Sequence, residues 1–212
     1  MANNYYPIML DLTNKNCIIV GGGKVALRKV KGLINKNANI KVISPNIISG
    51  FYSIDNINIK ILNKEYSRGD LKGGDVVFIC TDSKEVNDKC LIEAKEENLL
   101  INMADRQSEC DFILPSKIER GELTISISTS GNSPTYASKL KDDIEEMLPN
   151  GIEEYIVALG ETRKLIKSNI SDIKLRKKIL NELVNEKILD QVRLGYVANI
   201  NDLMMNIYSR YK

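Results

Sequence analysis

The sequence predicts an α/β protein: a Rossmann-type, doubly wound parallel sheet, followed by a small β-hairpin and helix segment and an all-helical C-terminal region. Three observations support this prediction. Apolar runs of strand length alternate with amphipathic segments as far as residue 105, the pattern of a parallel sheet with helices on both faces. A glycine triplet at residues 21–23 ends the first of these runs. Apolar residues recur at helical spacing from residue 152 onward.

The first strand leads directly into a turn that is typical of nucleotide binding. Residues 17–20 are apolar, as a strand buried on both faces requires, and Gly21, Gly22 and Gly23 follow at once. Glycine permits a tight turn and a close approach of the backbone to a pyrophosphate, and small Ala26 permits close helix packing. The helix that starts at Lys24 and Val25 directs its positive end toward an anion. We therefore expect residues 21–25 to bind a dinucleotide.

A second strand, residues 39–44, follows at the distance expected of a βαβ unit. The acidic residue that usually binds the ribose hydroxyls after this strand is absent, and Ser44, Pro45 and Asn46 stand there instead. Ribose contacts would then come from the Ser44 hydroxyl, the Asn46 amide and the main chain. Charge leaves the choice between NAD and NADP open, and we favour NAD.

Three further strands and one helix complete the predicted sheet. The strands are expected at residues 59–62, 76–81 and 99–103, and the helix at residues 83–97. In such sheets ligands bind outside the carboxyl ends of the strands. We expect one cleft lined by the glycine turn, by Thr81 and Asp82 on the cofactor side, and by residues 102–106.

The pattern changes after Asp105. Residues 111–115 and 123–128 are predicted to form a hairpin joined by the polar segment 116–122, and residues 6–12 a short strand-like lead-in. Ser133 and Pro134 supply an N-cap and a first-turn proline for a helix that ends at Met147. We expect three domains, at residues 1–113, 114–148 and 149–212.

Composition narrows the possible chemistry. The chain has 212 residues, a net charge of +2 and 43% hydrophobic residues, so it predicts a globular protein without a nucleic-acid partner. The sequence shows neither a membrane span nor a signal peptide, which predicts a cytoplasmic protein. Four cysteines without a C-x-x-C pair predict free thiols and no metal site. The chain contains no histidine, so acid-base chemistry falls to Asp, Glu, Lys, Tyr or water.

Two polar groups are the main candidates for this chemistry. Asp105 ends the fifth predicted strand and is followed by Arg106. Residues 128–134 combine small hydroxyl side chains, a glycine and a new helix N-terminus, which together can hold a carboxylate or a phosphate. We expect Asp105 to be catalytic. We expect the substrate to be bound by Asn102, Arg106, Ser128, Thr129, Ser130 and Gly131.

Five motifs together resemble the precorrin-2 dehydrogenase family, which includes the N-terminal module of sirohaem synthase and members with sirohydrochlorin ferrochelatase activity. They are Tyr-Pro-Ile-Met-Leu-Asp-Leu at residues 6–12, Cys-Ile-Ile-Val-Gly-Gly-Gly-Lys-Val-Ala at 17–26, Asn102-x-x-Asp105, Asp-Phe-Ile-Leu-Pro-Ser at 111–116, and Ser-Thr-Ser-Gly-Asn-Ser-Pro at 128–134. The resemblance spans residues 5 to about 150 in order. The helical tail matches only in type and length.

The resemblance implies NAD-dependent oxidation of precorrin-2 to sirohydrochlorin, in some members followed by insertion of a ferrous ion to give sirohaem. It implies a catalytic role for Asp105, and cofactor contacts by Lys24-Val25 and by Pro45-Asn46. Ser130 departs from the glycine often found at that position in the family. The resemblance also implies a homodimer in which the hairpin and the following helix are exchanged between the two copies.

Two other interpretations are open from the sequence. The first is a non-catalytic, dinucleotide-sensing regulatory domain whose helical tail conveys NAD occupancy to a partner. The second is a short-chain dehydrogenase with Tyr-x-x-x-Lys chemistry, for which Tyr208 and Lys212 have the required spacing. A terminal helix far from the strand ends is a poor place for that pair, so we interpret the match as coincidence.

Overall fold

The computed structural model of the chain describes residues 4–55, 58–197 and 199–211. It divides into two compact units, residues 1–114 and 115–212. This division falls one residue beyond the first domain boundary expected from the sequence, and the boundary expected after residue 148 lies within the second unit. The division into three domains stays a prediction.

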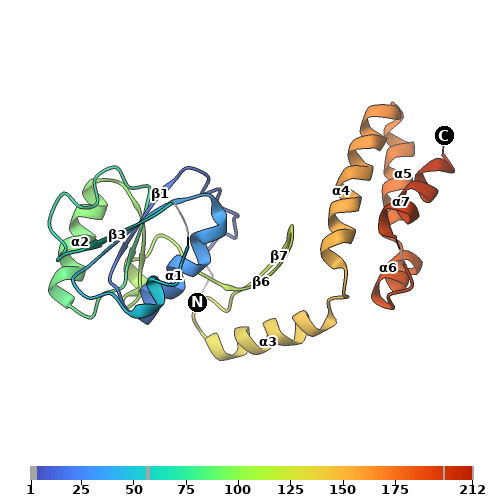
Figure 1. Cartoon of the computed structure of the whole chain (residues 1–212). Helices are drawn as coiled ribbons and strands as arrows, with labels where there is room; N and C mark the ends of the chain where they lie inside the picture. The colour runs from blue at the N-terminus through green and yellow to red at the C-terminus, as the bar shows by residue number, and fades with distance from the viewer. Residues whose placement is uncertain (1–3, 56–57, 198, 212) are drawn as a thin grey trace. The chain divides into compact units, whose positions relative to one another are not determined.

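The first unit is built on a five-stranded sheet with the strand order β3-β2-β1-β4-β5. Figure 1 shows this unit in blue and green, with β1, β3, α1 and α2 labelled. All of its strand pairings are parallel. Strands β2 and β3 are added in turn on one side of β1, and β4 and β5 are added on its other side. This order confirms the doubly wound fold. The strands are β1 (Asn16–Val20), β2 (Asn39–Ser44), β3 (Ile59–Asn63), β4 (Val76–Ile79) and β5 (Leu100–Met103).

Two helices cover opposite faces of this sheet, because alternate side chains of each strand point to opposite faces. Helix α1 (Lys24–Leu33) buries Ala26 and Val30 in the core that contains Cys17 and Ile19 of β1. Helix α2 (Lys84–Glu96) packs in the core that contains the other β1 side chains, Ile18 and Val20. Short 3-10 turns occur in the connections, at η1 (Ile34–Lys36), η2 (Ser49–Phe51) and η3 (Gln107–Glu109).

Helix α2 also carries a buried carboxylate that organises the loop between β3 and β4. Glu93 is 3% exposed, and its Oε1 accepts a hydrogen bond from the Leu71 amide at 2.8 Å. The Gly69 amide donates to the same carboxylate, as does the hydroxyl of Tyr66. Burial and this carboxylate raise the pKa of Tyr66. Glu93 therefore serves the fold by pairing buried backbone donors.

The second unit begins with a hairpin and continues as helices. Strands β6 (Ser116–Arg120) and β7 (Leu123–Ile127) pair in antiparallel fashion. Ser133 caps the next helix by accepting from the Tyr136 amide, as predicted, and the Tyr155 hydroxyl donates to the Leu183 carbonyl at 2.7 Å within the helical core. No helix in the described part of the chain is long and apolar enough to cross a membrane. The helices are α3 (Pro134–Met147), α4 (Ile152–Asn169), α5 (Ile173–Leu183), α6 (Glu186–Arg193) and α7 (Ile200–Ser209).

The prediction of a short strand-like lead-in at residues 6–12 was wrong. This segment has no regular secondary structure, and Tyr6, Ile8 and Met9 are exposed. Pro7 supplies no amide hydrogen for a strand pairing, and the segment joins neither edge of the sheet that the structure describes.

The hairpin forms, but its predicted first strand was wrong. Residues 111–115 are irregular, and the strand lies in the segment that was expected to be the connection. Asp111 is tied to the edge of β5 instead, since its carboxylate accepts from the Ile101 amide and its own amide donates to the Ile101 carbonyl, both at 2.9 Å. A two-residue turn suffices between the strands because Gly121 has a φ of +57°.

Candidate functional site

The glycine turn after β1 packs against the loops that follow its two neighbouring strands. Gly21 has a φ of +125°, and a Cβ there would lie 2.5 Å from the carbonyl oxygen of Cys80, just after β4. A Cβ at Gly22 would lie 2.1 Å from the carbonyl oxygen of Asn46, after β2. Distances this short exclude any side chain at either position. The first two glycines are therefore required to bring three loops together at the carboxyl edge of the sheet.

Gly23 differs from the other two glycines because it faces open space. A Cβ at Gly23 would meet no described atom within 4 Å. Gly23 is also the N-cap of α1, whose first turn contains no acidic residue and whose N-cap makes no side-chain hydrogen bond among the described residues. Lys24 and Val25 are exposed beside it. This helix end is open to an anion, as the sequence predicts for a pyrophosphate.

The loop after β2 is braced by Ser44. Its hydroxyl donates to the Asn46 carbonyl at 2.9 Å and accepts from the Asn46 amide at 3.4 Å, and Ser44 is only 8% exposed. The Ile48 amide donates to the Gly22 carbonyl at 3.1 Å, which ties the loop to the glycine turn. Pro45 and Asn46 are exposed. Of the residues expected to contact ribose, Ser44 therefore stabilises the conformation of the loop, while Pro45 and Asn46 lie at its exposed surface.

The loops after β4 and β5 are joined by a residue that the sequence analysis missed. Asn87 of α2 is 2% exposed and accepts from the Thr81 hydroxyl at 2.6 Å. Its Nδ2 donates to the Thr81 carbonyl at 3.0 Å and to Asp105 Oδ2 at 3.1 Å. The available signal was its place in the buried stripe of α2, where Asn87 stands four residues before Leu91 and seven before Ala94. A polar side chain in such a stripe indicates buried partners.

Asp105 lies at the surface with charged neighbours. Its carboxylate is 42% exposed, and Arg106 Nε lies 3.5 Å from its Oδ2. Arg106 Nη2 lies 2.7 Å from Asp88 Oδ1, and this neighbouring carboxylate raises the pKa of the guanidinium. Asp82 is exposed in the loop between β4 and α2. The structure therefore brings Thr81 and Asp105 together through Asn87 and leaves the Asp105 carboxylate accessible.

Asn102 points to the other face of the sheet, where both ends of its side-chain amide are engaged. Its Oδ1 accepts from Lys29 Nζ at 2.9 Å, and its Nδ2 donates to the Phe112 carbonyl at 2.9 Å. Lys29 Nζ also lies 5.7 Å from the centre of the Phe78 ring, and burial lowers the pKa of this ammonium group. Asn102 thus connects α1 to the strand that precedes Asp105.

Residues 128–134 form a tight loop at the start of α3, in the second unit. The Ser128 hydroxyl accepts from the Ser130 amide and the Thr129 hydroxyl accepts from the Ser133 amide, both at 3.1 Å. Ser130 and Gly131 have φ values of +53° and +86°. Two successive residues in this conformation turn the backbone sharply before the helix, so these hydroxyl groups define the shape of the loop.

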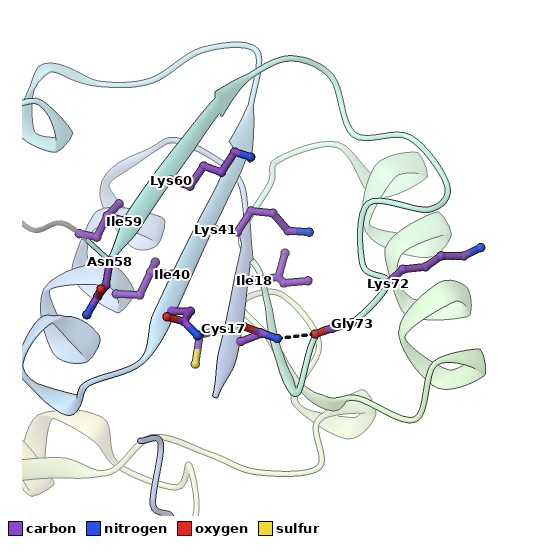
Figure 2. A pocket seen from close by; sticks show the side chains of 11 residues that line it. Cys17, Ile18, Ile40, Lys41, Asn58, Ile59, Lys60, Lys72 and Gly73 are labelled. Atoms are coloured by element: carbon purple, nitrogen blue, oxygen red, sulfur yellow. Dashed lines mark hydrogen bonds between the residues drawn. The ribbon is translucent and has the colours of Figure 1, made fainter. Parts of the chain in front are cut away.

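A pocket of about 350 Å³ lies at the opposite, amino edge of the sheet (Figure 2). Asn16, Asn39 and Ile59, which begin β1, β2 and β3, all line it. Lys41 and Lys60 occupy paired positions on β2 and β3 within it. It contains none of the residues predicted to bind cofactor or substrate.

Comparison with known proteins agrees with this geometry. Residues 8–116 match the family described as "Putative NAD(P)-binding", and residues 120–147 match the family described as "Sirohaem biosynthesis protein central". The first match covers the sheet and the loops that follow β1, β2, β4 and β5.

Similar proteins were found by sequence and by structure. The chain is 29% identical over 192 residues to a siroheme synthase of Pseudoalteromonas translucida, covering 90% of this chain and 41% of that protein. It is 31% identical over 205 residues to a siroheme synthase of Hydrogenovibrio crunogenus, covering 95% of this chain and 43% of that protein. The chain thus spans less than half the length of these relatives.

A solved structure, described as SirC, precorrin-2 dehydrogenase, matches with a TM-score of 0.76 and 25% identity. The match covers 97% of this chain and 100% of that chain. The resemblance inferred from the five motifs is therefore confirmed by sequence and by fold. The chain belongs to the family described as "Putative NAD(P)-binding", and within it is similar to siroheme synthases and to a precorrin-2 dehydrogenase.

Proposed function

We propose that the chain catalyses the NAD-dependent dehydrogenation of precorrin-2 to sirohydrochlorin, with Asp105 as the catalytic residue. The observation that carries this proposal is a continuous set of contacts from the glycine turn to Asp105. Gly21 packs on Cys80, Thr81 follows, and Asn87 joins Thr81 to Asp105. An accessible carboxylate and an open helix end thus share one edge of the sheet. The similarity to SirC, a precorrin-2 dehydrogenase, supports the choice of substrate.

The residues of the glycine turn fit a dinucleotide. Gly23 leaves room for a pyrophosphate, the N-terminus of α1 favours its charge, and Lys24 adds a cation. Pro45 and Asn46 offer surface to the ribose, and Thr81 and Asp82 lie after the neighbouring strand. NAD supplies a hydride acceptor when it is bound.

The remaining chemistry belongs to side chains of the protein. Oxidation of a reduced tetrapyrrole carbon releases a hydride and a proton, so a base must take the proton. The chain has no histidine, and Asp105 is an exposed carboxylate that Asn87 joins to Thr81, in the loop that packs on the glycine turn. Burial raises the pKa of the Cys80 thiol to about 11, so that sulfur is protonated at neutral pH. We assign the proton to Asp105 and substrate carboxylates to Arg106 and to residues 128–131.

We also propose a homodimer, supported by apolar surface in both units. Tyr6 is 85% exposed and Met9 is 72% exposed in the N-terminal segment. Helix α3 buries Ala137 alone among its described residues, while its Met147 is 77% exposed. Exposed apolar side chains gathered in one segment, as in residues 6–9, favour burial against another protein surface. The proposal expects twice the chain mass by light scattering at micromolar concentration, and a monomeric mass would contradict it.

A reducing, cytoplasmic location accompanies this proposal. It is supported by the cysteines, since Cys17, Cys80, Cys90 and Cys110 are all free. Cell fractionation tests it.

Gly23→Ala tests the cofactor site. A methyl group there meets no described protein atom but enters the space assigned to the pyrophosphate. We expect the protein to fold while its Kd for NAD rises at least about tenfold, an effect of about 1.4 kcal/mol, measured by isothermal titration calorimetry. Gly32→Ala is the matched control, because Gly32 lies within α1 and is equally unobstructed. Equal NAD affinity in both variants would contradict the assignment.

Asp105→Asn tests the catalytic role. The amide keeps the shape of the side chain but is a poor base, so kcat for precorrin-2 oxidation should fall roughly 10²- to 10⁴-fold. The Kd for NAD should stay within about twofold, because among the described residues Asp105 is linked to the glycine turn through Asn87 and Thr81. Anaerobic absorbance of the tetrapyrrole measures the reaction, and Asp55→Asn, in an exposed loop, serves as the control.

The same assay decides between the enzyme and the sensor. Wild-type protein that binds NAD without oxidising precorrin-2 would favour a dinucleotide-sensing domain. Unchanged turnover in Asp105→Asn would remove Asp105 from the mechanism.

Ferrous ion added after oxidation tests insertion of the metal, which some members of the resembled family perform. The Tyr208–Lys212 alternative finds no support, because Tyr208 is buried in the helical core and Lys212 lies outside the described residues.

A further inference from the structure

Two consecutive residues of α2 hold the two consecutive residues that follow β5. Asn87 Nδ2 donates to Asp105 Oδ2 at 3.1 Å, and Asp88 Oδ1 lies 2.7 Å from Arg106 Nη2. Each partner in the loop thus has its own counterpart on the helix. Two contacts from consecutive helix residues fix both the position of Asp105 and Arg106 along α2 and their orientation toward it.

The orientation of the Asn87 amide is fixed by what surrounds it. Its Nδ2 faces two groups that can only accept, the Thr81 carbonyl and the Asp105 carboxylate. Its Oδ1 faces the Thr81 hydroxyl at 2.6 Å, which can donate. Exchange of the two amide atoms would place the amide oxygen against the Thr81 carbonyl and the Asp105 carboxylate, and so break both of the hydrogen bonds that Nδ2 donates. At 2% exposure such a loss is costly, so the amide stays in one orientation.

This arrangement engages one oxygen of Asp105 and leaves the other accessible. Oδ2 receives the Asn87 hydrogen bond and lies 3.5 Å from Arg106 Nε. Oδ1 makes no hydrogen bond or ion pair among the residues that the structure describes. We propose that Asn87 is a positioning residue for precorrin-2 oxidation, holding Asp105 by Oδ2 so that Oδ1 faces the reacting carbon. This inference rests on the proposed function.

Helix α2 and the loop after β4 make Asn87 a suitable anchor. Ser83 caps the helix, and its carbonyl accepts from the Asn87 amide at 2.9 Å, so the backbone of Asn87 is fixed within the first turns. Thr81 belongs to the loop that packs on the glycine turn. Asn87 therefore transmits the position of the nucleotide loops to the catalytic carboxylate. A displacement of about 1 Å in such a group costs up to roughly 10²-fold in rate.

Two substitutions at Asn87 test the proposal with the full chain. Asn87→Leu keeps the size but removes both donors, and we expect kcat to fall about 10- to 100-fold with the Kd for NAD nearly unchanged. Asn87→Asp places a second carboxylate beside Asp105, and we expect the acidic limb of the kcat profile to move upward by about one pH unit or more. Arg106 and, behind it, Asp88 are the other charged groups at this carboxylate, and the Cys80 thiol lies within its electrostatic reach.

Glu93→Gln is the matched control, because Glu93 is a buried, hydrogen-bonded polar residue on the same helix that faces residues 66–71. It should lower stability as the Asn87 variants do while leaving the pH profile of kcat unchanged. If both Asn87 variants keep the wild-type kcat and pH profile, or if Glu93→Gln moves the profile equally, Asn87 has no positioning role.

Crystal structures separate this inference from the proposed function. In Asn87→Leu we expect the Asp105 carboxylate to leave the position it has in the wild-type protein, whether or not precorrin-2 is the substrate. An unmoved carboxylate would overturn the positioning role even if turnover falls. Wild-type protein without turnover would overturn the proposed function, and the two structures would then decide the role of Asn87 alone.

Discussion

The close contact between Gly21 and the Cys80 carbonyl is the constraint on which the rest of the site depends. It can form only because residue 21 has no side chain and adopts a positive φ. The contact joins the loops after β1 and β4. These two strands lie at the point where successive strands switch from one side of β1 to the other. Since β1 and β4 are neighbours, this is where a doubly wound sheet opens a crevice for a ligand.

The contact of Gly21 with Cys80 determines where the glycine turn and the Asp105 carboxylate lie. Gly22 admits the Asn46 carbonyl on the other side, so the turn is held between two loops while Gly23 alone faces open space. Thr81 comes next after Cys80, and its hydroxyl and carbonyl bind the amide that also holds Asp105. The glycine turn and the Asp105 carboxylate are therefore coupled through buried polar contacts, which have stricter geometry than exposed ones.

The sequence predicted most of the first unit because its signals are local. The apolar run at residues 17–20 and the glycine triplet identify strand and turn without any knowledge of distant residues. The hairpin was misplaced because Asp111 binds the backbone of Ile101 in β5, 10 residues earlier, and is therefore not free to begin a new strand. An apolar pattern does not show that a neighbouring polar residue has such a partner.

The same limit applies to the candidate site. Asp105 could be singled out as a candidate from its place at a strand end. For Asn87 the sequence gives only a polar residue in a buried helical stripe, and its partners, 6 and 18 residues away, are seen only in the structure. Asn102 and Ser44 were expected to face ligand, and the structure shows that each has internal partners. Short polar side chains can either bind a ligand or hydrogen-bond within the protein, and only the tertiary contacts show which of the two a given side chain does.

The most direct test of this account is a crystal structure of the protein with bound NAD. The account predicts the pyrophosphate against the Gly23 backbone at the start of α1, and the nicotinamide on the side of the sheet edge where Asp105 is held by Asn87. NAD bound in the lysine-lined pocket at the amino edge, or a nicotinamide turned away from Asp105, would contradict it.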